Sequence, residues 1–299
     1  MSSPQRPAPP DPATDPALPQ IDSSLFELDG RAYKDLSRPA AAQRAAYHQA
    51  RTVQFLASLS SAPQAEEIPM AVRPAAAGGW WTDFTNFGTS PYWTPEYGTQ
   101  EAGGEGWIMH SDGNTSSRMR FNYTLNDGSS PYTRVIARLR GAPDNGKNSY
   151  VTLIEQSCAD NPGGKYACDE IDIVEYYGQT SYQRSEFTVY QNGQQGSSYT
   201  MVWPTQANDP GHTQTYYNIY LEPGNYLWWG LYDLNGNFLG SWDKHSSDGY
   251  IPTRPMNLYV GIWDIGASDG ICVDNPPGSF TGDSWMALSL IEVDVEVNA

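Results

Sequence analysis

The regular alternation of short strand-like runs with turn clusters constrains the fold of this chain most. From Trp80 onward, runs rich in β-branched and aromatic residues are separated by clusters of Gly, Pro, Asn, Asp and Ser, a pattern typical of strands joined by turns. The expected strands span residues 107–110, 118–125, 133–140, 149–155, 170–177, 185–191, 199–203, 215–221, 226–233, 237–242, 256–263 and 285–297. Because about 220 residues suit one β-sandwich, we predict an all-β fold of that kind.

Residues 1–78 differ in composition from the rest of the chain. All 10 tryptophans lie at or after Trp80, and the first 20 residues are rich in Pro, Ala and Asp. Such a segment buries too little apolar surface to order itself, so we expect a mostly disordered leader. Alanines and apolar residues over 40–59 predict one short helix, either outside the sandwich or unpacked. The predicted division is a leader over 1–78 and a sandwich domain over 79–299.

One predicted strand, residues 170–177, carries three carboxylates. Its acids, Glu170, Asp172 and Glu175, alternate with large aliphatic residues. Because side chains of a strand alternate between faces, Glu170 and Asp172 share one face, whereas Glu175 would fall on the other. A β-bulge between Asp172 and Glu175 would return Glu175 to the first face, and bulges are common beside active sites. We therefore predict three acids on one face of a bulged strand.

This row of acids indicates either catalysis or simple exposure to solvent. Like charges a few ångströms apart raise one another's pKa and destabilise a fold. A retaining glycosidase uses such a row, because one ionised carboxylate attacks the anomeric carbon while a protonated one donates to the leaving oxygen. The alternative is an edge strand whose acids point to water. The six residues from the first acid to the last do not decide between these by themselves.

The segment Glu-Ile-Asp-Ile-Val-Glu at 170–175 resembles the E-x-D-x-x-E signature of glycoside hydrolase family 16. Residues 132–139 and 212–221 resemble two further segments of that family, and residues 255–263 are similar to a strand of its lichenase and xyloglucan transglycosylase branches; the order of the segments agrees. The resemblance therefore covers about residues 80–297.

The resemblance implies a concanavalin A-like jelly roll and specific roles for the acids. Glu170 would be the nucleophile, Asp172 the helper carboxylate and Glu175 the acid/base. Two features depart from the family pattern: residues 149–153 replace its tryptophan-containing W-P-A-x-W stretch, and Tyr190 replaces a histidine often found on the following strand. These departures leave the substrate open.

Aromatic residues are candidates for binding sugar rings, because an aromatic face stacks on the C–H face of a pyranose. The candidates are Trp263, Trp203 and Trp107, together with Tyr190 beside the acidic strand. Packing in the core is the alternative for each tryptophan, since ten must fit in one sandwich. The match of residues 255–263 to a family strand favours Trp263 as a platform.

The charge of the chain limits its partners. Seventeen basic and 34 acidic residues give a net charge of −17, which argues against nucleic acid and anionic membranes as partners. No apolar run approaches the length of a membrane span. We expect a monomer that binds a neutral polysaccharide and requires no cofactor. Asp294, on the last predicted strand, is a candidate ligand for the structural calcium that the family often binds.

Three cysteines bear on the compartment. Cys158 and Cys168 bracket a turn-rich loop ahead of the acidic strand and could form a disulfide, leaving Cys272 as a free thiol. A disulfide would imply an oxidising compartment, and we expect an extracellular protein. Against this, the residues after Met1 lack the apolar segment of a secretory signal. Reduced cysteines in a cytoplasmic protein are the alternative.

The combined hypothesis is a retaining endo-glycosidase that hydrolyses a β-linked polysaccharide, a β-1,3- or β-1,3(4)-glucan. A transglycosylase needs the same three acids and differs only in the acceptor. A lectin on the same sandwich would keep an aromatic surface without needing Glu170, Asp172 and Glu175 together. A structural or appendage protein is a third class, indicated only by residues 1–78.

Overall fold

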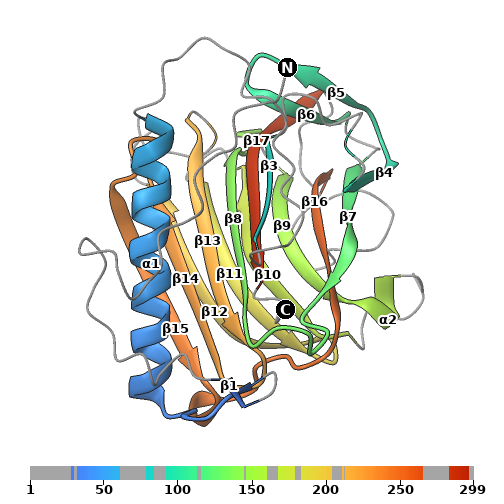
Figure 1. The fold of residues 1–299 in the computed structure, drawn as a ribbon. Coiled ribbons are helices and arrows are strands. Elements are labelled where there is room, and N and C mark those ends of the chain that lie inside the picture. The colour runs from blue at the N-terminus through green and yellow to red at the C-terminus, as the bar shows by residue number, and fades with distance from the viewer. Residues whose placement is uncertain are drawn as a thin grey trace, which may run out of the picture.

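A computed structural model describes residues 28–29, 32–60, 79–83, 90, 92–112, 116–144, 146–159, 168–178, 183–203, 211, 213–264 and 283–295. The described chain is almost entirely β, and two antiparallel sheets face each other (Figure 1). This arrangement confirms the predicted β-sandwich. The expectation of disorder for residues 1–20 lies outside the described residues.

The first sheet, sheet I, contains the acidic strand. Its spatial order is β12 (Gln194–Trp203), β11 (Gln183–Gln191), β10 (Glu170–Tyr177), β9 (Lys147–Glu155), β16 (Met256–Asp264), β7 (Ser117–Leu125) and β4 (Trp93–Tyr97). The acidic strand β10 is thus an interior strand with partners on both edges.

The second sheet, sheet II, packs face to face with sheet I. Its order is β15 (Phe238–His245), β14 (Tyr226–Tyr232), β13 (Thr215–Glu222), β8 (Thr133–Arg140), β17 (Ser284–Val295), β6 (Gly106–Ser111) and β5 (Gln100–Gly103), and β3 (Gly79–Asp83) also pairs with β17. The remaining elements are β1 (Leu28–Asp29), β2 (Ala32–Tyr33), α1 (Arg38–Ser60), α2 (Gln156–Ala159) and the 3-10 turn Ser246–Asp248.

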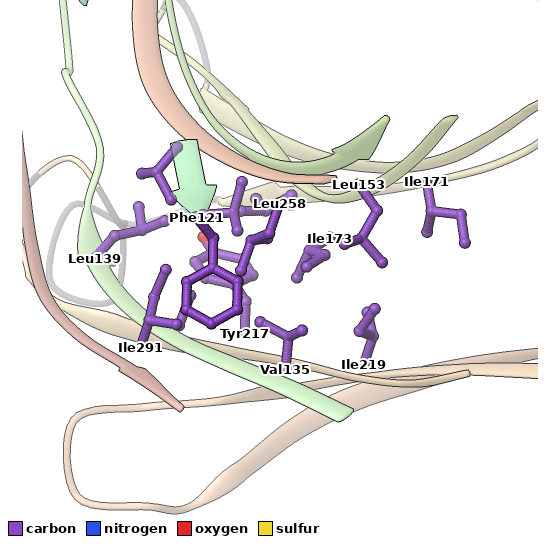
Figure 2. Close-up of a cluster of buried hydrophobic side chains, with 14 of the residues drawn as sticks. Phe121, Val135, Leu139, Leu153, Ile171, Ile173, Tyr217, Ile219, Leu258 and Ile291 are labelled. Carbon is purple, nitrogen blue, oxygen red and sulfur yellow. The ribbon is translucent and has the colours of Figure 1, made fainter. Parts of the chain in front are cut away.

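The main core fills the space between the two sheets. Leu153 and Ile171 of sheet I face Val135 and Ile219 of sheet II, and all four side chains are fully buried (Figure 2). Alternate residues of each strand point into this layer, as period-2 geometry requires. The opposite face of sheet I is therefore free to carry polar groups.

Every strand expected from the sequence is present, with ends shifted by a few residues. The strands that the sequence did not predict are β3, β4 and β5, together with the short β1 and β2. β4 is interrupted by Pro95, which argues against a strand assignment, and β5 contains no β-branched or aromatic residue. Pairing with β7 and β6 holds them in place.

The predicted helix over 40–59 is confirmed as α1, and it packs against sheet II rather than standing apart. Ser37 caps its first turn by accepting a hydrogen bond from the backbone of Ala40, with Pro39 in that turn. Ala41, Ala45 and Leu56 are buried. α1 lies along β13 and β14 on the side of sheet II away from the main core (Figure 1).

A second apolar cluster forms between α1 and sheet II, the α1 interface. Its sheet residues are mainly aromatic: Tyr132, Ile136, Tyr216, Tyr220, Tyr226, Trp228, Tyr232 and Leu290. Without α1 these rings would form a large exposed apolar patch. The helix therefore packs on the outside of the sandwich, the first of the two placements expected from the sequence.

Candidate active site

The acids of β10 are brought together by a bulge. Asp172 pairs with Thr152 of β9, whereas Val174 pairs with the adjacent Val151, so Ile173 is the extra residue. The predicted bulge is thereby confirmed. Ile171, Ile173 and Val174 all pack in the main core. The three carboxylates are left on the opposite side of sheet I, here called the acid face.

Neighbouring polar groups hold the carboxylates in place. The Thr152 hydroxyl donates to Glu170 Oε1 at 3.1 Å, and Asn148 Nδ2 donates to Glu175 Oε1 at 2.8 Å. From sheet II, the indole N–H of Trp229 donates to the backbone carbonyl of Asp172 at 3.0 Å. The bulged backbone is therefore fixed through the core as well as along β9.

Burial and mutual repulsion raise the pKa of all three acids. Burial and the charge of Glu175 raise the pKa of Glu170 to about 7. Burial, followed by the charges of Glu175 and Glu170, raises the pKa of Asp172 well above its usual range. Burial also raises the pKa of Glu175, although hydrogen bonds from Asn148 and Tyr177 favour its ionised form. Burial and mutual repulsion therefore oppose simultaneous ionisation of the three carboxyls.

Asp172 connects the two glutamates. Hydrogen bonds link it to both Glu170 and Glu175, and its buried Oδ2 atom finds no hydrogen-bond donor among the residues that the structure describes. Since a carboxylate can only accept, a hydrogen bond between two carboxyls requires that one carry a proton. The triad can therefore hold a proton next to an ionised carboxylate.

Aromatic rings extend the acid face from β9 to β16. Trp263 packs on Tyr150 with ring centroids 4.6 Å apart, and Trp263 remains partly exposed at the end of β16. A Cβ on Gly261 would lie 2.4 Å from the Tyr150 hydroxyl, so glycine is required for Tyr150 to cross β16. The structure thus places Trp263 on the same face as the acids.

The other predicted aromatic residues lie in different surroundings. Tyr190 pairs with Glu170 across β10 and β11 and is partly buried on the acid face. Trp203 ends β12, and its side chain lies outside the described residues. Trp107 is a core residue, 7% exposed, whose indole N–H donates to Gln100. Its prediction as a sugar platform was wrong, because the inward face of β6 points at sheet I.

The sequence did not single out several further residues of the acid face. Arg118 of β7 pairs with Glu96 of β4 at 2.6 Å and lies over the Tyr259 ring at 4.5 Å. Its positive charge partly opposes the upward shift of the Glu170 pKa. Polar residues alternate with core residues along β7 and β9, and that alternation was the available signal for Arg118 and Thr152.

Comparisons with known proteins agree with this geometry. The model of the family "Glycosyl hydrolases family 16" matches residues 89–280. The chain belongs to this family. Among curated protein sequences, none matches it.

Solved structures of family 16 share the fold of this chain. A Crh5 transglycosylase in complex with NAG is 16% identical, with a TM-score of 0.56, and the match covers 74% of this chain and 85% of that one. The laminarinase catalytic domain of Thermotoga maritima is 16% identical, with a TM-score of 0.55, covering 73% and 98%. The β-glucanase of Bacillus licheniformis is 16% identical, with a TM-score of 0.54, covering 73% and 99%. The described part of this family 16 chain is therefore a jelly-roll sandwich like theirs.

The calcium ligand expected at Asp294 does not fit this family 16 chain. Its carboxylate lies in the α1 interface, 3.0 Å from Arg134 and 3.4 Å from Arg51, and it accepts a hydrogen bond from the Tyr132 hydroxyl. Two guanidinium groups would oppose a bound calcium ion, which needs oxygen ligands. Within the described ranges, no group of three or more His, Cys, Asp or Glu side chains could hold a metal.

The loop ahead of the acid strand is closed by a disulfide. Cys158 and Cys168 are joined, with their Cα atoms 5.9 Å apart, and the backbone carbonyl of Cys168 accepts a hydrogen bond from Gly193. Cys272 lies outside the described residues. Of the described helices, none has the length and apolar character to cross a membrane.

Proposed function

We propose that this family 16 chain is a retaining endo-glycosidase that hydrolyses a β-linked polysaccharide. The observation that carries the proposal is the acid triad: three carboxyls on one face of β10, all with raised pKa values and joined by hydrogen bonds. Such a cluster destabilises the fold, and a catalytic use would account for its presence. A double-displacement mechanism uses one ionised and one protonated carboxyl at the same time.

In this mechanism Glu170 attacks the anomeric carbon while Glu175 protonates the departing oxygen. A glycosyl–enzyme ester forms as the glycosidic bond breaks. Glu175, now ionised, takes a proton from water, and that water displaces Glu170 from the sugar. Asp172 holds the Glu170 carboxylate by hydrogen bonding, and its hydrogen bond to Glu175 tunes the proton affinity of that residue. Both displacements leave the net charge of the triad unchanged.

The proposed substrate is a β-1,3- or β-1,3(4)-glucan. Trp263 on Tyr150 offers an aromatic surface to a pyranose ring beside the acids. A net charge of −17 disfavours a polyanionic substrate. Structurally similar proteins include a laminarinase and a β-1,3-1,4-glucanase (lichenase), which supports this substrate class without fixing the linkage.

Transglycosylation is the second candidate. It uses the same glycosyl–enzyme intermediate, with a sugar hydroxyl in place of water as acceptor, and one of the structurally similar proteins is a transglycosylase. Product lengths separate the two reactions, because transfer yields oligosaccharides longer than the starting material.

We further propose that the protein works outside the cytoplasm, as a monomer that requires no cofactor. The Cys158–Cys168 disulfide supports an oxidising compartment. Mass spectrometry of unreduced peptides from the native source tests this. A linked peptide pair supports the proposal, whereas two free thiols would contradict it.

The test of the proposed function is incubation of the purified protein with laminarin, lichenan, xyloglucan and agarose. The Glu170→Gln variant serves as a control for contaminating enzymes. Laminarin or lichenan should be cut internally by the wild type and left intact by the variant. Binding of these glucans without cleavage would support the lectin alternative instead.

A further inference from the structure

A second charged pair lies beside the acid triad, on β11. Glu186 is directly opposite Glu175 in the strand register, and Arg184 is opposite Tyr177. The next residue, Phe187, points into the main core, so Arg184 and Glu186 lie on the acid face. Arg184 Nε lies 2.7 Å from Glu186 Oε1, and the two side chains are only 16% and 22% exposed.

The register gives this pair a defined orientation toward Glu175. The negative member, Glu186, is the direct neighbour of Glu175, whereas the positive member is two residues farther along β11. Arg184 also lies over the ring of Tyr177 at 4.5 Å, and Tyr177 donates a hydrogen bond to Glu175. The pair therefore presents its negative end to the acid/base.

Other groups around Glu175 are accounted for on each neighbouring strand. β10 contributes Glu170, Asp172 and Tyr177, and β9 contributes Asn148 and Tyr150, whose burial raises its pKa and keeps it neutral. The hydrogen bonds from Asn148, Tyr177 and Asp172 favour the ionised form of Glu175, whereas burial and the charge of Glu186 oppose it. Glu186 and Arg184 are the charged contributions from β11.

We propose that Glu186 is a positioning residue that keeps Glu175 protonated, and that Arg184 limits this effect by neutralising Glu186. Its catalytic meaning rests on the proposed function, since a proton on Glu175 is what the leaving oxygen receives. An unpaired Glu186 would raise the proton affinity of Glu175 too far for transfer to the leaving oxygen. Without Glu186, the hydrogen bonds from Asn148 and Tyr177 would favour loss of the proton from Glu175. The ion pair sets the balance between these extremes.

The test is the pH dependence of kcat/KM for Glu186→Gln and Arg184→Gln. The basic limb of the profile reports loss of the proton from the acid. Glu186→Gln should move this limb down by about one pH unit, because the negative charge that opposes ionisation of Glu175 is then gone. Arg184→Gln should move it up by about half a unit, because Glu186 is then unpaired. Glu101→Gln on β5 of sheet II changes the net charge as Glu186→Gln does, and it should move neither limb.

A purely structural ion pair would behave differently. Both variants would then lower the melting temperature and leave the basic limb within about 0.2 units of wild type. That result, or shifts of the same sign in both variants, would overturn the inference.

A direct titration separates this inference from the proposed function. The ¹³C resonance of the Glu175 carboxyl, assigned with Glu175→Gln, should titrate lower in Glu186→Gln and higher in Arg184→Gln than in wild type. If these shifts occur in a protein that cleaves no glycan, the proposed function fails and the electrostatic role of Glu186 stands. If glucans are cleaved and the resonance does not move, only the role of Glu186 fails.

Discussion

The acid face of sheet I and the α1 interface of sheet II bury ionisable groups in opposite ways. On the acid face, Glu170, Asp172 and Glu175 repel one another, and their pKa values are raised. In the α1 interface, Arg44 forms a two-point ion pair with Glu222, at 2.6 and 2.8 Å. Charges are concentrated in the first region and neutralised in the second.

The difference separates function from architecture. Buried charges that serve stability are paired and hydrogen-bonded, and Glu222 also accepts from Tyr220 and Asn225. Buried charges left in repulsion lower stability and therefore indicate a chemical use. Substitutions should accordingly affect activity without loss of stability on the acid face, and stability without loss of chemistry under α1.

The largest expected effect is on turnover. Glu170→Gln removes the nucleophile and should lower kcat by on the order of 10⁴-fold. It should also raise the unfolding free energy above pH 7. Because the pKa of Glu170 is higher in the folded protein than in the unfolded chain, ionisation of Glu170 lowers the stability of the fold. The amide of the variant cannot ionise and avoids this loss. Assays of kcat alongside urea denaturation at pH 8 check both. A variant that is inactive because it is unfolded would contradict the expected division of roles.

The next effect is on stability. Arg44→Met leaves Glu222 buried and unpaired and should cost about 3–5 kcal/mol of unfolding free energy. The kcat measured well below the melting temperature should be unchanged. Arg38 provides the matched control on the same helix, because its ion pairs with Asp243 and Asp248 are exposed, and Arg38→Gln should cost at most about 1 kcal/mol. Equal losses in the two variants would show that α1 is not held by its buried pair.

A smaller effect concerns pH and His48. This ring is fully enclosed, stacked on Tyr220 with centroids 4.6 Å apart. Its pKa is lowered well below the usual range, first by burial and then by Arg51, Arg134 and Arg44. The unfolding free energy therefore keeps the full contribution of neutral His48 above the unfolded pKa of about 6.5. Below that pH it falls by up to about 1.4 kcal/mol per pH unit.

His48→Phe keeps an aromatic ring against Tyr132 and Tyr220 and removes the titration. Between pH 6.5 and 5 the unfolding free energy of this variant should fall less steeply than that of wild type. Denaturation curves at several pH values measure the difference. Parallel curves would mean that His48 takes up its proton in the folded protein as easily as in the unfolded chain.

The smallest effect is on binding. Trp263→Ala should weaken glucan affinity by about tenfold, which is on the order of 1.4 kcal/mol, by removing the ring that packs on Tyr150. Calorimetric titration with an oligosaccharide, using the inactive Glu170→Gln background, measures this. A lowered melting temperature with unchanged affinity would show that Trp263 is a packing residue.

The sequence predicted the sandwich, the acid strand and its bulge because each follows from a local pattern. Period-2 alternation placed Glu170 and Asp172 together, and the five-residue step to Glu175 required the bulge. The sequence left open whether α1 packs on the sandwich, because the aromatic residues under the helix come from strands far apart in the chain. Trp107 was misassigned for a related reason: its strand is nearly continuous in apolar residues, so alternation could not tell which face it occupies. The guanidinium partners of Asp294 likewise come from α1 and β8, which only the fold brings to β17.

Glu170 and Glu175 should carry out a double displacement on one face of β10. The most direct measurement is the anomeric configuration of the first product, followed by ¹H NMR during the first minutes of glucan cleavage, before mutarotation. For a double displacement on a β-glucan, the β-anomer should appear first and the α-anomer should grow in later. Initial release of the α-anomer would show inversion, and the assignment of Glu170 as nucleophile would then be wrong.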